Sequence, residues 1–237
     1  MPAKNYSCGL FYYLNGGKMK LNIIISDYTY MKDTYCIAGW SPSEQRMRRL
    51  MINGHHWSEK EANKVEGHSC VQVETIPIPL NEERDYPHKT EDTWISENIV
   101  PLYRFDSPAD LAYELEDSLS KNIATIFNGH LKENSYVLPG TKCASLGAIK
   151  VPAQNLEFYK DSENKLRVKI LDNDGQKYDL RVTCRYLRDV LDKMNGLKSL
   201  NEQLKQVTFA HVRVGLAKPY YKQENHCFLM CNGVFLF

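Results

Sequence analysis

The sequence predicts an all-β protein, rich in β-strands with one or two short helices, that is organised as two tandem modules. Short segments that alternate apolar and polar residues recur along the 237 residues, and clusters of Gly, Pro, Asn and Asp separate them. The charge also changes sign along the chain. Residues 1–139 carry 14 Lys and Arg against 19 Asp and Glu, whereas residues 140–237 carry 16 against 10. We therefore expect one module over residues 20–139 and a second, better suited to a polyanion, over residues 140–237.

The first module contains several strand candidates. Residues 21–26 (LNIIIS) and 34–38 (TYCIA) flank a polar turn, and residues 45–52 fit either a strand or a short helix. Residues 70–80 alternate cleanly until Pro77 and Pro79, which end regular pairing or place the segment at a sheet edge.

A helix is predicted over residues 107–123. Ser107 is a suitable N-cap, Pro108 suits the first helical position, and Asp110 follows the cap by three residues. An apolar stripe then recurs every four residues, at Leu111, Leu115, Leu119 and Ile123. We expect this helix to cover one end of the first β-module.

The second module repeats the β pattern after residue 140. A hairpin is indicated by two alternating segments, 165–171 and 176–183, around the turn sequence DNDG. Other strands are expected over residues 145–151, 156–159, 211–217 and 226–237. A helix is plausible over 185–194, and the polar stretch to Gln206 is expected to be a connection.

Five strands and a helix per module is the inventory of a small Greek-key barrel of the OB type. The sequence thus predicts two tandem OB-like barrels. SH3-like barrels or one large sandwich fit the same periodicity nearly as well.

Several short motifs, in this order and spacing, also resemble the bacterial dual OB-containing domain family. They are CIAG at 36–39, PHKTEDTW at 87–94, Ser145-Leu146, LRVK at 166–169, YDLRVT at 178–183 and VRVGLAKP at 212–219. The similarity covers roughly residues 20–237. It implies two OB barrels and an ancillary nucleic-acid-binding role beside mobile-element or phage-conflict systems, with no catalytic residues to carry over. The chain departs from the family pattern at Arg48-Arg49-Leu50 and at residues 214–218, which suggests a different ligand.

Catalytic and metal-binding motifs are scarce. The sequence has no GxSxG, GxxxxGK[ST], HExxH or GxGxxG. The seven cysteines are not spaced as in disulfide-bonded proteins, and Cys227 and Cys231 have no second pair to complete a zinc site. We therefore expect buried thiols, no metal, no cofactor and no enzymatic activity.

Three clusters of residues leave a binding, catalytic or metal site open as an alternative. His55, His56 and Trp57 form either a binding site or an exposed turn with a packed tryptophan. His68 and Cys70 suit a nucleophile pair only if the thiol is accessible, and it looks buried. An acid–base or metal cluster is conceivable at His88, Glu91 and Asp92, although a polar loop fits better.

Nucleic-acid binding by OB barrels combines a basic groove with aromatic rings on which bases stack. The second-module hairpin carries its basic residues on one face, which equally suits a solvated barrel exterior. The candidate residues there are Arg167, Lys169, Lys177 and Arg181, with Tyr159, Tyr220 and Tyr221 as stacking rings. A second candidate patch comprises Arg46, Arg48, Arg49, His55, His56 and Trp57. Its acidic surroundings favour a small ligand or a protein partner there over a long polyanion.

We expect a non-catalytic, cytoplasmic protein that binds nucleic acid, single-stranded or structurally altered, without a membrane partner. No apolar run approaches the roughly 18–20 residues that cross a bilayer, and residues 1–17 make a poor signal peptide. Three alternatives stay open: a module that docks on a partner enzyme of the same system, a sensor of a nucleotide-sized ligand between the barrels, and a Cys/His hydrolase or transferase.

Overall fold

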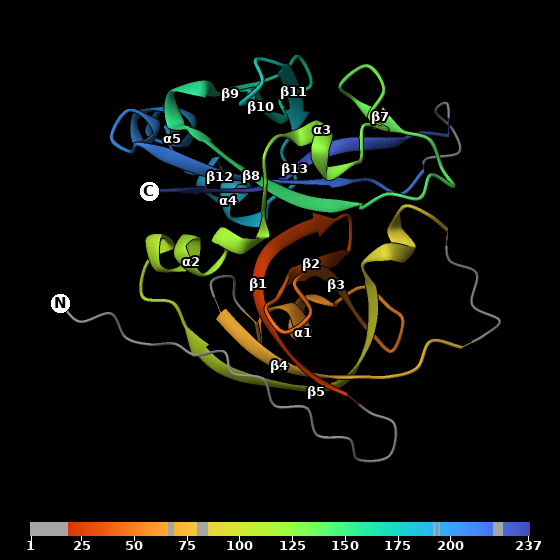
Figure 1. Cartoon of the computed structure of the whole chain (residues 1–237). Helices are drawn as coiled ribbons and strands as arrows, with labels where there is room; N and C mark the ends of the chain where they lie inside the picture. Colours follow the sequence, from red (N-terminus) through yellow and green to blue (C-terminus); the bar gives the residue numbers. More distant parts are fainter. Residues whose placement is uncertain (1–18, 66–68, 80–84, 192, 194, 220–224) are drawn as a thin grey trace.

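Two β structures, one from each half of the chain, lie against each other in the computed structural model (Figure 1). The structure describes residues 19–65, 69–79, 85–191, 193, 195–219 and 225–237. The first half forms a closed five-stranded barrel, and the second half forms a five-stranded sheet and a three-stranded sheet. The predicted β-rich, tandem OB-like architecture is confirmed.

The first barrel closes in the strand order β1-β2-β3-β5-β4. Its described neighbours are antiparallel except for β3 and β5, which run parallel. This arrangement is a five-stranded Greek-key barrel of the OB type. The strands are β1 (Lys20–Met31), β2 (Thr34–Ser41), β3 (Arg46–Ile52), β4 (Ser69–Thr75) and β5 (Asp92–Arg104).

For two of these strands the structure goes beyond what the sequence predicted. Strand β3 resolves the choice between strand and helix, because its backbone pairs with β2 on one side and β5 on the other. Strand β5 was not anticipated. Its residues from 97 onward are largely exposed, so they show no alternation of apolar and polar residues. Between the strands lie the short helix α1 (Glu59–Ala62), with a capping box from Ser58 and Glu61, and the 3₁₀ turn η1 (His88–Thr90).

The predicted helix over 107–123 starts correctly but is too long. Helix α2 (Pro108–Glu114) begins after the Ser107 cap, and the chain then forms the 3₁₀ turn η2 (Glu116–Ser118) and the short strand β6 (Leu119–Ser120). Asn122 then caps a separate helix, α3 (Ile123–Ile126). The helix is interrupted because residues 119–120 pair with β8 of the second half, so the four-residue spacing of the leucines does not come from one continuous helix.

The second half contains two sheets. One has the order β6-β8-β12-β13-β7 and the other β11-β10-β9. Strands β6 and β7 precede residue 140 in the chain but pair with second-half strands. The further elements are β7 (Tyr136–Val137), β8 (Leu146–Pro152), η3 (Ala153–Asn155), β9 (Leu156–Lys160), β10 (Leu166–Leu171), β11 (Lys177–Arg181), β12 (Phe209–Leu216) and β13 (Cys227–Leu236).

Two helices cover the second half, where the sequence predicted one. Helix α4 (Arg185–Leu191) was expected, but the polar stretch expected to be a connection forms α5 (Gly196–Leu204). Leu200 and Leu204 of α5 are buried. The Asn201 side chain also binds the backbone of Phe158 in β9 through two hydrogen bonds, of 3.1 and 2.9 Å. These tertiary contacts stabilise a helix whose sequence carries little apolar signal.

An apolar cluster joins the two halves. Leu111 of α2 and Leu115, which caps its C-terminus, pack with Ile24 and Trp40 of the barrel and with Phe235 of β13. The predicted helix therefore covers one end of the barrel, as expected, and also contacts the second half. Among the described residues, no helix has the length and apolar character needed to span a bilayer.

Replacing Leu111 by Ala should lower the free energy of unfolding by about 2–5 kcal/mol, because the truncation leaves a cavity in the cluster between the halves. Tyr113→Ala on the same helix removes a side chain that is 80% exposed and should change stability by less than about 0.5 kcal/mol. Urea unfolding of both variants measures the difference. Equal losses would contradict the assigned packing of α2.

Candidate functional site

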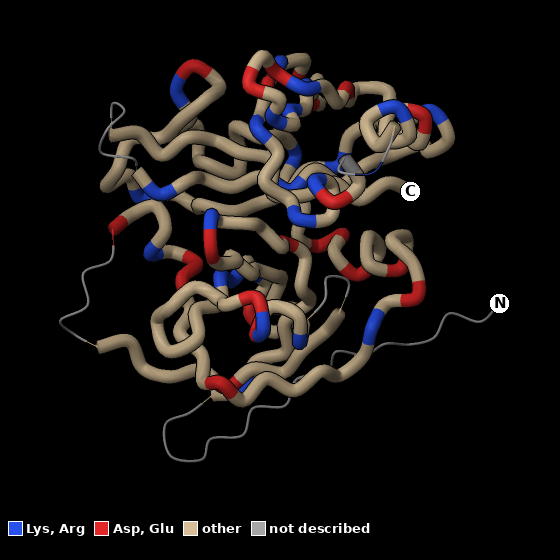
Figure 2. The backbone as a smooth tube through the Cα atoms, turned by 180° about the vertical axis from the view of Figure 1, so that it is seen from behind, with Lys and Arg blue, Asp and Glu red and all other residues tan. Residues whose placement is uncertain are grey.

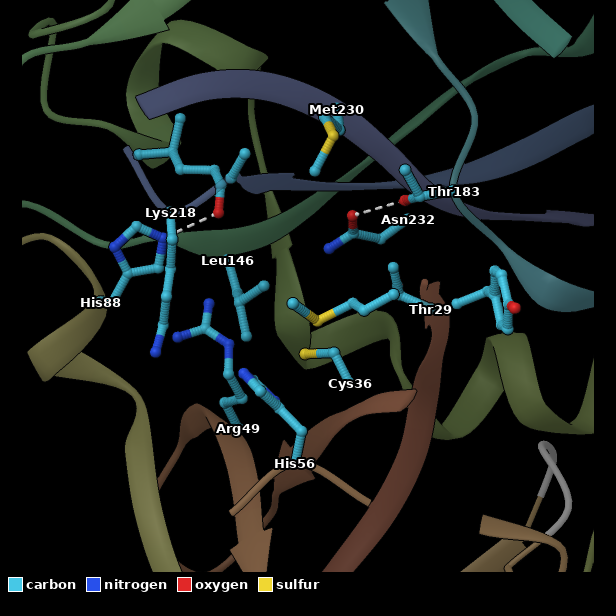
Figure 3. Close-up of a pocket in the computed structure, with 14 residues that line it drawn as sticks. Thr29, Cys36, Arg49, His56, His88, Leu146, Thr183, Lys218, Met230 and Asn232 are labelled. Atoms are coloured by element: carbon cyan, nitrogen blue, oxygen red, sulfur yellow. Dashed lines mark hydrogen bonds between the residues drawn. The ribbon is translucent and has the colours of Figure 1, made fainter. Parts of the chain in front are cut away.

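A cavity of about 240 Å³ lies between the first barrel and the second half (Figure 3). Residues of β1, β2 and β3 contribute to its lining from the first barrel, and residues of β8 and β13 and the segment after β12 contribute from the second half. Strands 2 and 3 and the adjoining loops form the ligand-binding face of an OB barrel. The cavity therefore opens on the face where barrels of this type bind ligands.

Arg49 is the central cation of this site. It projects from β3 opposite Asp92 of β5, to which its guanidinium is ion-paired at 2.5 Å. A second guanidinium nitrogen donates a hydrogen bond to Ser145 Oγ of the second half at 2.9 Å. The side chain of Arg49 lines the cavity, although the residue is only 4% exposed. Its charge is thus retained in a largely dry setting by the Asp92 carboxylate.

Glu91 completes a buried polar group, here called the Arg49 cluster and consisting of Arg49, Glu91, Asp92 and Ser145. The Glu91 carboxylate accepts hydrogen bonds from the Ser145 hydroxyl at 2.6 Å and from the Ser145 backbone N–H at 3.0 Å. Burial raises the pKa of Glu91 to about 7, against the opposing effects of these hydrogen bonds and of Arg49. The cluster binds β3 and the start of β5 to the segment that precedes β8.

Two histidines flank Arg49 in the cavity lining. His88 of η1 makes a 2.9 Å hydrogen bond through Nε2 with the carbonyl oxygen of Leu216. Burial, with repulsion from Arg49, lowers the pKa of His88 to about 4. Burial also lowers the pKa of His56, as do Lys218 and Arg49. Both rings are therefore predominantly neutral at pH 7.

The opposite side of the cavity is polar but uncharged. Thr183 Oγ1 donates a hydrogen bond to Asn232 Oδ1 at 3.3 Å, and Thr29 lies beside them (Figure 3). Tyr30 lies at the rim with 38% of its surface exposed, and the Arg188 guanidinium is 4.9 Å from the centre of its ring. Apolar side chains, among them Leu146 and Met230, separate the two sides.

The structure brings two of the predicted first-module residues into the cavity and places two elsewhere. Arg49 and His56 line it. Arg48 points to the other side of β3, since successive strand residues alternate, and is ion-paired with Glu44 while donating to Thr93 Oγ1 at 3.2 Å. Trp57 is fully buried, with Nε1 donating to the Leu50 carbonyl at 2.6 Å, so its ring is out of reach of a stacking base.

The second-module hairpin carries its predicted residues on one face, but acidic side chains lie among them. Lys169 is ion-paired with Glu157 of β9 at 2.9 Å, and Arg167 with Asp179 of β11 at 2.9 Å. Tyr159 donates a hydrogen bond to Asp179 at 2.6 Å. Figure 2 shows acidic and basic positions interleaved at this end of the molecule.

The other predicted candidates are located as follows. Lys177 and Arg181 are exposed on β11, whereas Tyr220, Tyr221 and His68 lie outside the described residues. Cys70, Cys227 and Cys231 are buried. The described part of the chain contains no group of three or more His, Cys, Asp or Glu side chains arranged to hold a metal ion.

Sequence reasoning missed four residues of the site: Thr29, Thr183, Lys218 and Asn232. Each comes from a different segment; Thr183 and Lys218 lie within the YDLRVT and VRVGLAKP motifs, which gave them no individual role. His88 was named, although as part of a different cluster. The cavity arises from the contact between the two halves, so no local spacing in the sequence could have indicated it.

The strand order of the barrel and the second set of sheets define a tandem OB-fold protein. The sequence model of the dual OB-containing domain matches residues 21–234, and the chain belongs to this family. A search of curated proteins finds no match.

Solved structures with a similar arrangement are distant. The Ifi202 HINa domain in complex with 20bp dsDNA has 10% identity and a TM-score of 0.37, with 92% of this chain and 94% of that chain covered. A murine DNA binding protein bound with ds DNA has 8% identity and a TM-score of 0.33, with 92% and 97% covered. These scores are too low to transfer the neighbours' DNA binding to this chain.

The pKa of His88 makes the stability of the protein depend on pH. Below about pH 6.5 the unfolded chain binds a proton at this residue, whereas the folded protein does so only near pH 4. Between pH 7 and pH 5, wild type should therefore lose about 2 kcal/mol of unfolding free energy that His88→Gln does not lose. The difference between the proteins isolates His88 from Glu91, whose raised pKa acts in the opposite direction.

Urea unfolding at the two pH values provides the measurement. His55→Gln, at an exposed position, is the matched control and should follow wild type. A His88→Gln profile parallel to wild type would contradict the assigned neutral, buried ring.

Proposed function

We propose that this protein binds single-stranded nucleic acid through the β2–β3 face of its first barrel, beside the cavity. The observation that carries this proposal is the position of Lys218 of the second half, which lines the cavity beside that face together with His56 and with Arg49, whose charge is paired with Asp92. An OB barrel that binds a single strand needs positive charge for phosphates and flat rings for bases. The family membership supports the fold part of this inference.

The rim of the cavity supplies groups suited to a strand. Lys218 is exposed and brings a positive charge from the second half. Tyr30, with Arg188 against its ring, provides an aromatic surface at another part of the rim. A strand lying over the β2–β3 face would thus meet a cation and an aromatic group in succession.

The hairpin first considered from sequence is less suited to the same task. Arg167 and Lys169 already neutralise Asp179 and Glu157, so phosphate groups would have to compete with these carboxylates. Lys177 and Arg181 remain candidates for an outer contact. The proposed main contact is therefore on the first barrel, with the hairpin in a secondary role.

The role we propose is non-catalytic. Burial raises the pKa of the Cys36 thiol, which lines the cavity, so it is protonated at neutral pH and a poor nucleophile. The residues that line the cavity include neither a serine nucleophile nor a carboxylate that could complete a catalytic triad with His56 or His88. We further propose, as the family resemblance implied, an ancillary function within a bacterial conflict, defence or mobile-element system.

Lys218→Ala should weaken binding of a fluorescent single-stranded oligonucleotide about tenfold at low salt. It should also reduce the slope of log affinity against log salt by about 0.7–1, because one phosphate contact is lost. Fluorescence anisotropy at several salt concentrations, with single-stranded DNA, single-stranded RNA and duplex DNA, gives both quantities.

Lys169→Ala removes the same charge from the hairpin and is the matched control, with an expected change below about twofold. A larger loss for Lys169→Ala than for Lys218→Ala would place the interface on the hairpin instead. Absence of binding to every oligonucleotide at low salt would refute the proposed function.

A further inference from the structure

Thr29 and His56 both line the cavity, and each carries a buried polar atom without a hydrogen-bond partner among the described residues. The atoms are Thr29 Oγ1 and His56 Nδ1. Thr29 is only 6% exposed, so bulk water does not readily satisfy its hydroxyl. Buried polar groups in native proteins are nearly always paired. Two unpaired ones lining the same cavity indicate that a polar ligand supplies the missing partners.

The two atoms lie on opposite sides of the cavity, and these sides differ in chemistry (Figure 3). His56 is on the side that holds Arg49 and Lys218, which suits an anion. Thr29 is on the side that holds Thr183 and Asn232, which suits a neutral hydrogen-bonding group. A ligand that hydrogen-bonds to both His56 and Thr29 must combine an anionic part with a neutral polar part.

The neutral side presents its groups in a fixed orientation. Asn232 is 7% exposed, and its Oδ1 already accepts the hydrogen bond from Thr183. Its Nδ2 points away from Thr183 into the cavity (Figure 3). The Thr29 hydroxyl and this amide nitrogen can together bind the edge of a planar heterocycle, while Met230 and Leu146 offer apolar contact to its faces.

We propose that the cavity holds a single nucleotide unit, with its phosphate beside Arg49, His56 and Lys218 and its base beside Thr29 and Asn232. The volume of about 240 Å³ lies below the roughly 300–1,000 Å³ of drug-sized ligand sites, which limits the occupant to one unit. The unit is either a free nucleoside monophosphate or the phosphorylated end of a strand. This inference rests on the proposed function and specifies which part of the nucleic acid enters the protein.

The decisive variant is Thr29→Val, which replaces the unpaired hydroxyl by a methyl group of the same shape. Replacing an unsatisfied buried polar group in this way is neutral or stabilising. We therefore expect an unchanged or higher melting temperature, together with about a tenfold loss of affinity for nucleoside 5′-monophosphates. A residue with a purely structural role would not show this combination. Thr34→Val, in the neighbouring strand β2 and outside the cavity lining, is the matched control and should leave affinity unchanged.

The titration uses the full chain with the four ribonucleoside 5′-monophosphates, the corresponding nucleosides, inorganic phosphate, and one oligonucleotide with and without a 5′-phosphate. Lys218→Ala should weaken both phosphate and nucleotide binding. Thr29→Val should weaken nucleotide binding and leave phosphate binding unchanged. Tighter binding of the 5′-phosphorylated oligonucleotide than of the free nucleotide would identify a strand end as the occupant, and the reverse order would identify the free nucleotide.

Three results distinguish failure of the nucleotide site from failure of the proposed function. Oligonucleotide binding without any effect of a 5′-phosphate, of free nucleotides or of Thr29→Val would overturn the nucleotide site and leave the proposed function standing. Nucleotide binding without oligonucleotide binding would support the site and overturn the proposed function. Destabilisation by Thr29→Val with unchanged nucleotide affinity would show that the hydroxyl is structural and overturn the inference.

Discussion

The relative placement of the two halves depends on the buried Arg49 cluster. Arg49 pairs with Asp92 inside the first barrel and reaches Ser145 of the second half, which in turn binds Glu91. A buried ion pair adds little net stability, because desolvation offsets most of the attraction. Its effect is on geometry, since Ser145 of the second half hydrogen-bonds to both Arg49 and Glu91 of the first. These hydrogen bonds help to fix how the two halves meet around the cavity.

Further connections across the interface make the cavity a preformed site. The backbone N–H of Tyr30 donates to the Thr183 carbonyl at 3.2 Å, and the N–H of Thr183 donates to the Cys231 carbonyl at 2.9 Å. Arg213 of β12, fully buried, lies 3.4 Å from the Asp27 carboxylate of β1. Strand β1 is thus joined to the second half by main-chain and side-chain contacts. The polar side chains nearest these contacts are held in place before any ligand binds.

Charged groups in the cavity and on the hairpin surface differ in how strongly solvent screens them. On the hairpin, basic and acidic residues from neighbouring strands neutralise one another in water, consistent with a formal net charge of only +1. In the cavity wall, Arg49 and Asp92 pair where solvent is largely excluded, so their interaction is less screened. The same burial lowers the pKa values of His56 and His88 and leaves Thr29 unpaired. These features cost stability, which is typical of binding sites.

The sequence alone determined the β-rich class, the tandem barrels and the second-module hairpin, because alternation and turn residues act over a few neighbours. It also indicated the start of α2 from Ser107 and Pro108, and it named Arg49 and His56. It did not indicate β5, the early end of α2, or helix α5, since pairing and packing with distant segments decide these. The partners of Lys169 and Arg167 depend on strand register. The cavity was decided by the tertiary structure, because Thr29, Lys218 and Asn232 become neighbours only when the Arg49 cluster holds the two halves together.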